Sequence, residues 1–207
     1  MTRIRKLFRP GPLAVLAAVV LIVFAVVFYF RAYRLRYFGE IEPGRVYRCR
    51  QPRGLQWGAL ERYDIERVIS LRTYATEPEM LERERAECAE AGAEFVHIPI
   101  SELVPSDEKF VEILRSIRTS PGPVLLHCQH GRDRTGMTFA AYRVLMHEWS
   151  IDRAIREEMV EYEADLTPEK RRKMEHILRR IQANRAEWME RTSGEAPGEQ
   201  ATTRPGA

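Results

Sequence analysis

An unbroken apolar run near the amino terminus limits what this chain can fold into more than any other feature. Residues Pro12–Phe30 read PLAVLAAVVLIVFAVVFYF, with arginines on both sides. As a helix, the run would be roughly 28 Å long, close to the ~30 Å hydrocarbon core of a bilayer. A cleavable signal peptide has a shorter apolar core followed by small residues, and the segment from Phe28 to Arg31 offers none. We therefore expect a single-pass membrane helix over 12–30, with Tyr29 at one interface.

Basic residues are concentrated around this run. The 207 residues carry a formal net charge of +3, but seven of the 33 basic residues and no acidic residue lie between Met1 and Arg36. The remainder has 26 basic against 30 acidic residues, a net charge of −4, which argues against a nucleic-acid-binding surface. Because basic residues flank the run on both sides, the positive-inside rule has no clear answer here. A short basic amino terminus ahead of a first apolar segment usually stays in the cytoplasm, which favours a domain outside the cytoplasm.

Downstream of the run, short apolar segments alternate with longer amphipathic ones. This alternation predicts an α/β fold in which a central, mostly parallel sheet is flanked by helices, with sites at the carboxyl ends of the strands. Strands are expected at 46–48, 67–71, 95–98 and 124–127, and helices at 55–63, 78–91, 106–118, 135–148, 151–162 and 168–188. The expected organisation is a basic tail (1–11), the membrane helix (12–30), a connector (31–44), the folded domain (45–191) and a disordered tail (192–207).

The stretch VLLHCQHGRDRTG, residues 124–136, carries the chemistry. An apolar strand leads to Cys128, which opens a polar loop, and Arg134 closes the loop as a helix begins. Backbone N–H groups at a helix N-terminus stabilise a thiolate and also bind the oxygens of a phosphoryl group. Gly131 permits the tight curvature that turns those amides inward, and the Arg134 guanidinium can hold two phosphate oxygens. Thr135 places a hydroxyl beside the cysteine, where it would assist the departure of the thiolate.

These residues resemble those of a known family. Cys128, five further residues, Arg134 and Thr135 match the Cys-x5-Arg-Ser/Thr signature of the protein tyrosine phosphatase superfamily, and HCQHGRDRTG resembles its bacterial dual-specificity-type branch. The segment VYRCRQP at 46–52 is similar to the family's YRSxQP opening, and VISLR at 68–72 is similar to its VINLR strand. The resemblance covers roughly residues 41–165, with Tyr142-Arg143 similar to the helix after the loop.

The resemblance implies a cysteine phosphatase fold and a phosphomonoesterase that works through a cysteinyl-phosphate intermediate. Cys128 would be the nucleophile and Arg134 the phosphate clamp, with no metal or cofactor required. A phosphorylated protein or phospholipid would be the substrate. The loop that binds the phosphate would comprise Gln129, His130, Gly131, Arg132, Asp133 and Arg134.

The proton donor for the leaving group is less sharply marked. In this superfamily it is usually an aspartate on a separate loop, and the corresponding segment here is 98–108. Asp107 is the favoured candidate, ahead of Glu102 and Glu108, although Ser106-Asp107-Glu108 equally matches an N-cap followed by acids in a first helical turn. Asp133 is a third candidate. An aspartate at the same place in the loop occurs in the myotubularin and Sac-type lipid phosphatases, which this position resembles. This resemblance and the neighbouring basic Arg132 keep phosphoinositides as an alternative substrate class.

Two other classes compete with the phosphatase interpretation. A membrane-bound pseudophosphatase would bind phosphorylated partners without turnover, and a rhodanese-like sulfurtransferase also carries a loop cysteine between strand and helix. The complete Cys-Arg-Thr set favours a phosphatase over both. The three cysteines, Cys49, Cys88 and Cys128, are too few and too widely spaced for a disulfide framework or a zinc site.

Overall fold

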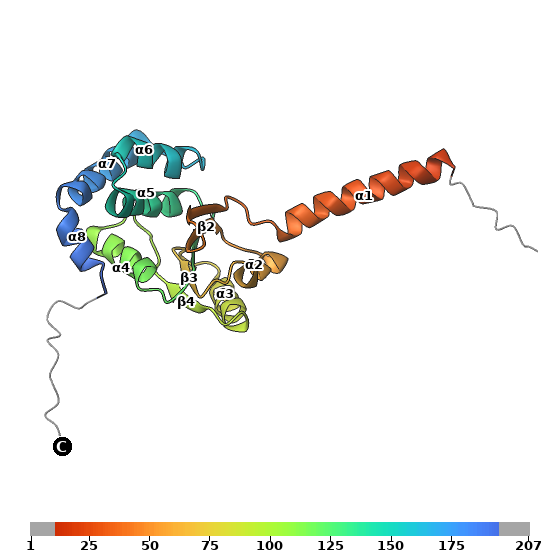
Figure 1. Ribbon diagram of the computed structural model, residues 1–207, viewed down its shortest axis with the longest axis horizontal. Helices are drawn as coiled ribbons and strands as arrows, with labels where there is room; N and C mark the ends of the chain where they lie inside the picture. Colours follow the sequence, from red (N-terminus) through yellow and green to blue (C-terminus); the bar gives the residue numbers. More distant parts are fainter. Residues whose placement is uncertain (1–10, 195–207) are drawn as a thin grey trace, which may run out of the picture.

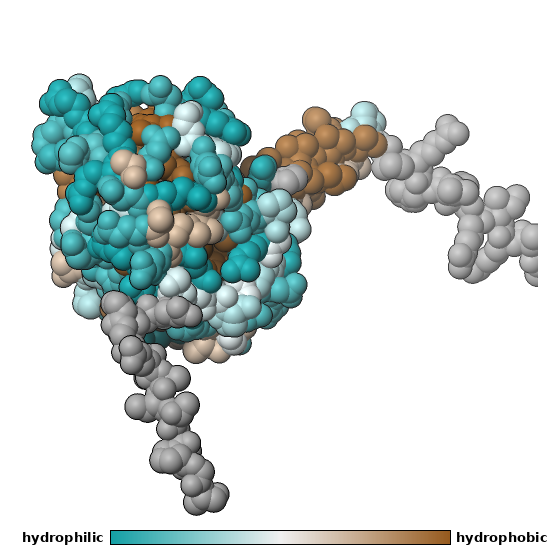
Figure 2. Space-filling model, turned by 60° about the vertical axis from the view of Figure 1, so that its left-hand side comes forward, coloured by the Kyte–Doolittle hydropathy of each residue, from teal (hydrophilic) through white to brown (hydrophobic). Residues whose placement is uncertain are grey.

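The computed structural model describes residues 11–194 and shows one long helix beside a compact α/β domain (Figure 1). Helix α1 (Pro12–Tyr33) projects away from the domain, and no residue of Pro12–Tyr29 is buried (Figure 1). In the space-filling view the helix is mostly hydrophobic, whereas the domain surface is mostly hydrophilic (Figure 2). By length and composition, α1 is a helix that could cross a membrane or serve as a signal sequence.

A five-stranded sheet forms the centre of the domain, in the order β1-β2-β5-β3-β4. Its strands are β1 (Gly39–Glu42), β2 (Val46–Arg50), β3 (Arg67–Ser70), β4 (Glu94–His97) and β5 (Val124–Cys128). The pairs β2–β5, β5–β3 and β3–β4 are parallel, and β1 pairs antiparallel with β2. The sheet is therefore mixed, and the parallel part of the prediction is confirmed. Strand β1 falls inside the segment expected to be a connector, because its antiparallel pairing depends on β2 rather than on any signal within its four residues.

Alternating side chains of the central strands enter two separate cores. Val68 and Leu125 face one core, whereas their neighbours Ile69 and Leu126 face the other. Such alternation is the period-two pattern of strands that are buried on both faces. The smaller core lies under the 3₁₀ turn η1 (Gly54–Gly58), α2 (Ala59–Arg62) and α3 (Pro78–Glu90). The larger core lies under α4 (Asp107–Arg118), α5 (Asp133–His147), α6 (Ile151–Ile155), the π-helical turn η2 (Arg156–Val160), α7 (Pro168–Ala183) and α8 (Arg185–Arg191) (Figure 1).

The helices begin where their capping residues predict. Ser106 accepts a hydrogen bond from the Lys109 N–H (3.3 Å) at the start of α4, and Thr167 caps α7 in the same way. At the other end of the domain, Thr192 is fully buried, and its hydroxyl donates to the Trp188 carbonyl (2.8 Å). The packed domain thus extends through Thr192, which the predicted disordered tail included. Residues 1–10 and 195–207, which hold most of the two predicted tails, lie outside the described residues.

Candidate active site

The polar loop between β5 and α5 is packed tightly against the end of β2. Gly131 bends the loop by adopting a left-handed backbone conformation, with φ of +72°. A Cβ atom at this position would lie 2.5 Å from the Arg50 nitrogen and 2.6 Å from the Cys49 carbonyl oxygen, so only glycine fits. The Gly131 N–H donates to the sulfur of Cys128 over 3.3 Å. A backbone amide directed at the sulfur stabilises negative charge on it.

A cavity of about 350 Å³ opens above this loop. Cys128 lies at the cavity although the residue as a whole is only 4% exposed. Arg134 extends along the wall, where its guanidinium also donates to the Leu71 carbonyl (3.3 Å). Five of the six predicted loop residues, all except Gly131, thus line the same cavity as Cys128. The lining comprises Glu102, Leu103, Cys128, Gln129, His130, Arg132, Asp133, Arg134, Met137, Asp165 and Lys170.

Thr135 is fully buried in the first turn of α5. Its hydroxyl is among the buried side-chain groups that make no hydrogen bond within residues 11–194. A buried hydroxyl without a partner is costly, and its conformation adjusts readily to a neighbouring acceptor. The hydroxyl is therefore able to donate a hydrogen bond to an acceptor that comes close to it.

A buried arginine holds the loop from behind. Arg48 on β2 is fully buried and donates from Nη2 to the Gly131 carbonyl over 3.0 Å. Its Nη1 bonds Glu158 of η2 twice, at the carbonyl (2.9 Å) and at Oε2 (2.8 Å). Arg143 of α5 pairs with the other oxygen of Glu158 (2.8 Å), and the Tyr162 ring lies 3.4 Å from the Arg48 guanidinium carbon. The buried charges are thus mutually compensated, and the amide of Gly131 stays directed at the sulfur.

A second buried network lies beneath the strand ends. Its centre is the carboxylate of Glu84 on α3, which is 2% exposed and accepts from Gln51 and Tyr74. His127, the residue before Cys128, places Nε2 3.8 Å from this carboxylate. Burial lowers the pKa of His127, against the opposing pull of Glu84, so the imidazole is neutral in the folded protein. Arg72, just after β3, pairs with Glu77 and also donates to Gln51.

The two thiols near the loop face opposite sides of the sheet. Cys49 belongs to the core under α2 and α3, whereas Cys128 belongs to the larger core. Burial raises the pKa of Cys49 well above its usual range, with a further contribution from Cys128. Cys49 is therefore a protonated, packed side chain.

The acidic candidates end in three different places. Asp107 is not among the cavity-lining residues: it begins α4 and its carboxylate pairs with Arg180 of α7. Asp133 lines the cavity, but its Oδ1 accepts from the Asp165 N–H (2.9 Å) and from Lys170 Nζ (2.9 Å). Glu102 lines the cavity from the loop between β4 and α4. The sequence around Asp107 matched both a helix start and a proton-donor loop. In the structure Asp107 is the first residue of helix α4.

Three important positions carried no signal in the sequence. Glu158 and Glu84 lie among other acidic residues of charged helical segments, and only the folded structure shows that these two are buried. Lys170 borders a charged helical stretch typical of a solvated face, yet its side chain is 9% exposed and lines the cavity. Its place directly after the Thr167-Pro168 helix start shows that it lies in a first turn, but not that this turn faces the site.

Comparison with known proteins agrees with this geometry. The model of the tyrosine phosphatase family matches residues 30–195. The chain belongs to this family. The resemblance predicted from the sequence to the protein tyrosine phosphatase superfamily, whose members are cysteine-based phosphatases, is confirmed.

Individual relatives within and around the tyrosine phosphatase family are distant. The chain is 28% identical over 114 residues to dual specificity protein phosphatase TpbA of Pseudomonas aeruginosa strain UCBPP-PA14. The aligned region covers 54% of this chain and 49% of TpbA. It therefore spans about half the length of the curated relatives it matches. The crystal structure of P. aeruginosa TpbA has a TM-score of 0.59 at 22% identity and covers 72% of this chain and 92% of that chain. The catalytic domain of the PP-IP phosphatase SIW14 from S. cerevisiae has a TM-score of 0.58 at 19% identity. The match covers 75% of this chain and 95% of the SIW14 domain. Both structures share the fold.

Proposed function

We propose that this protein is a phosphomonoesterase in which Cys128 is the nucleophile. The observation that carries the proposal is that Cys128 and Arg134 line one cavity while the Gly131 amide donates to the Cys128 sulfur. The thiolate attacks phosphorus, a P–S bond forms, and the P–O bond to the leaving group breaks. Arg134 and the loop amides stabilise the charge on the three phosphoryl oxygens. Water then attacks the phosphocysteine, which releases inorganic phosphate and returns the thiolate, assisted by the Thr135 hydroxyl.

Glu102 is the proton donor that the geometry favours. It lines the cavity, is exposed, and its carboxylate is held locally by the Ser101 N–H (3.1 Å). Asp107 is occupied by Arg180, and Asp133 is occupied by Lys170 and the Asp165 amide. Among the acids weighed from the sequence, Glu102 alone combines a place at the cavity with a carboxylate that pairs with no cation in residues 11–194.

Hydrolysis of aryl phosphates in the presence of a chelator tests both assignments. The full chain should turn over 4-nitrophenyl phosphate, and Cys128→Ser should abolish turnover.

Loss of a general acid lowers the rate by about 10²–10⁴-fold, and the loss is greatest for a poor leaving group. Glu102→Gln should therefore slow phenyl phosphate hydrolysis far more than 4-nitrophenyl phosphate hydrolysis, and Asp107→Asn should leave the ratio unchanged. If Asp107→Asn produces the leaving-group dependence instead, Glu102 is not the acid. Retained binding of phosphorylated ligands without turnover would identify a pseudophosphatase.

A phosphorylated protein is the substrate that the family favours, and TpbA carries the dual-specificity name. Inositol phosphates are a second candidate, favoured by two cations beyond the phosphate clamp. Lys170 and Arg132 line the same cavity, and a second phosphate group could replace their present carboxylate neighbours, Asp133 at 2.9 Å and Glu163 at 3.8 Å. Lys170→Gln should reduce the rate on an inositol bisphosphate and spare a phosphotyrosine peptide. An equal effect on both would remove the support for inositol phosphates.

We further propose that α1 anchors the protein in a membrane, with the domain outside the cytoplasm. The apolar length of α1, its exposure and the absence of small residues between Phe28 and Arg31 support an anchor. A cysteine introduced at exposed Glu90, in a Cys128→Ser background, provides a test because Cys49 and Cys88 are buried. Labelling in intact cells by a membrane-impermeant maleimide is expected. Labelling only after lysis would place the domain inside.

A further inference from the structure

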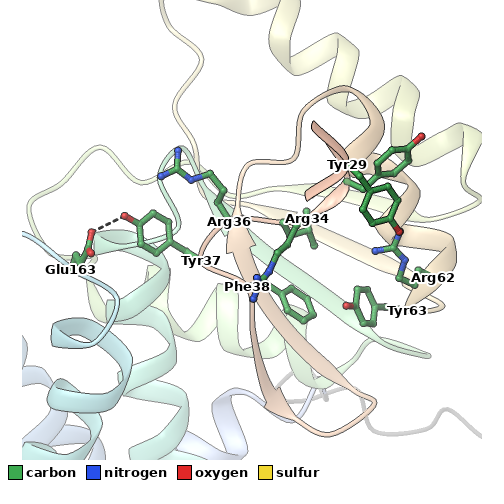
Figure 3. A pocket seen from close by; sticks show the side chains of 10 residues that line it. Tyr29, Arg34, Arg36, Tyr37, Phe38, Arg62, Tyr63 and Glu163 are labelled. Carbon is green, nitrogen blue, oxygen red and sulfur yellow. Dashed lines mark hydrogen bonds between the residues drawn. The ribbon is translucent and has the colours of Figure 1, made fainter. Parts of the chain in front are cut away.

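A wide crevice lies where α1 meets the domain (Figure 3). It is on the side of the domain from which α1 projects in Figure 1. Its volume is about 1090 Å³, three times that of the phosphate cavity. Its walls come from the last turns of α1, the segment that leads to β1, and the end of α2. The lining comprises Tyr29, Tyr33, Arg34, Leu35, Arg36, Tyr37, Phe38, Arg62, Tyr63 and Glu163.

The cations of this crevice are unpaired, although the backbone that carries them is held in place. The Arg34 carbonyl accepts from the Gln56 side chain (3.1 Å), and the Arg36 carbonyl accepts from the Arg50 N–H (2.8 Å). No ion pair within residues 11–194 includes Arg34, Arg36 or Arg62. Three guanidinium groups are therefore presented from a fixed segment without a protein carboxylate to neutralise them.

The single acid of the crevice is already engaged. Glu163 accepts from the Tyr37 hydroxyl (2.7 Å), shown as a dashed line in Figure 3, and lies 3.8 Å from Arg132 of the phosphate loop. It stands at the far side of the crevice from Arg62 (Figure 3). The lining thus has three cations against one paired carboxylate, and its net charge is positive.

Aromatic rings separate the cations. Phe38 stacks on Tyr63 with ring centroids 4.8 Å apart, and in Figure 3 this pair lies between the guanidinium groups of Arg34 and Arg62. Tyr29 and Tyr33 stack at 4.9 Å on the end of α1. Tyrosines at the end of an apolar helix lie at the level of lipid head groups, and arginines just beyond them reach lipid phosphates. The crevice combines an apolar surface for the upper acyl chain with cations for a phosphate.

We propose that this crevice binds the head group of an anionic phospholipid from the leaflet next to the domain. The proposal rests on the membrane anchoring proposed above. A lipid is the occupant that the position selects, because the crevice starts on the helix that would end at that leaflet. Arg34 and Arg62 attract the phosphodiester from the two sides of the ring pair, and the stacked rings contact the glycerol and the first methylenes. The bound lipid would orient the domain, and hence the phosphate cavity, relative to the membrane surface.

Native mass spectrometry of the delipidated full chain in mild detergent tests the proposal. Phosphatidylglycerol and phosphatidylcholine with identical acyl chains are offered in equal amounts. We expect a preference for phosphatidylglycerol that falls about fivefold for each arginine removed in Arg34→Gln and Arg62→Gln. The matched control, Arg172→Gln with Arg179→Gln, removes the same charge from the exposed face of α7 and should keep the preference. The melting temperature and turnover of 4-nitrophenyl phosphate should be unchanged in both double variants, which shows that each has folded.

Each result decides a separate point. An equal affinity for the two lipids, or an equal loss in the control variant, overturns the lipid site. Displacement of phosphatidylglycerol by inorganic phosphate also overturns it, because the crevice would then be a general anion site. Release of the chain from membranes by alkaline extraction overturns the anchor, and the lipid site with it. Failure of catalysis appears only in the aryl phosphate assay, so the enzymatic and lipid-binding proposals fail separately.

Discussion

Replacement of Gly131 by alanine tests the claim that the packing of the loop against β2 sets the phosphate site. The added Cβ would lie 2.5 Å from the Arg50 nitrogen and 2.6 Å from the Cys49 oxygen. Ordinary contact begins near 3.4 Å, so the loop must retreat by about 0.9 Å from two backbone atoms that belong to a strand. The Gly131 amide would leave the sulfur, and the Gly131 carbonyl would leave Arg48.

The size of the effect follows from two separate costs. Left-handed backbone costs a non-glycine residue about 1–2 kcal/mol, and overpacking adds about 1–3 kcal/mol. A misplacement of about 1 Å at a catalytic group can reduce turnover by roughly 100-fold. We therefore expect Gly131→Ala to lose about 100-fold in kcat/KM on 4-nitrophenyl phosphate and about 2–5 kcal/mol of stability.

Gly44 provides a matched control. Its φ of +70° equals that of Gly131 within 2°, but a Cβ at Gly44 would meet no atom within 4 Å. Gly44→Ala should therefore lose only the conformational cost, a fall in melting temperature of about 2–8 °C, with kcat/KM unchanged. Equal activities of the two variants would refute the reasoning, because strain alone would then account for both.

Two further predictions concern the buried groups behind the loop. Arg48→Met removes the bond to the Gly131 carbonyl and should lower kcat, and it should lower stability by about 3 kcal/mol. The control Arg143→Gln leaves Arg48 and Glu158 paired. It should lower stability but keep kcat within a few fold in the same melting and turnover assays. Burial lowers the pKa of His127, so below pH of about 6.5 the unfolded chain binds a proton that the folded chain does not, and stability falls as the pH falls. Melting temperatures between about pH 5 and 8 should show this slope, up to about 1.4 kcal/mol per pH unit, and His127→Gln should remove it; an unchanged slope would show that other groups cause it.

The sequence by itself was most informative where function depends on neighbouring residues. The loop from Cys128 to Arg134 is contiguous, and its conformation follows from a strand before it, a glycine within it and a helix after it. The apolar run, the N-caps at Ser106 and Thr167, and the alternation within the central strands are equally local. These features therefore sufficed for the family and for the parallel part of the sheet.

The tertiary structure decided which distant side chains meet. Arg48 and Glu158 are separated by 110 residues, and nothing in either segment indicates that both are buried or that they hold Gly131. The same applies to Lys170 at the cavity and to the presence of Glu102 rather than Asp107 in the cavity lining. An acid at a helix start and an acid at an active site have the same local pattern, because both sit near partial positive charge. Which of them reaches the cavity depends on the path of the loop between β4 and α4, and that path is set by packing against elements far away in the chain.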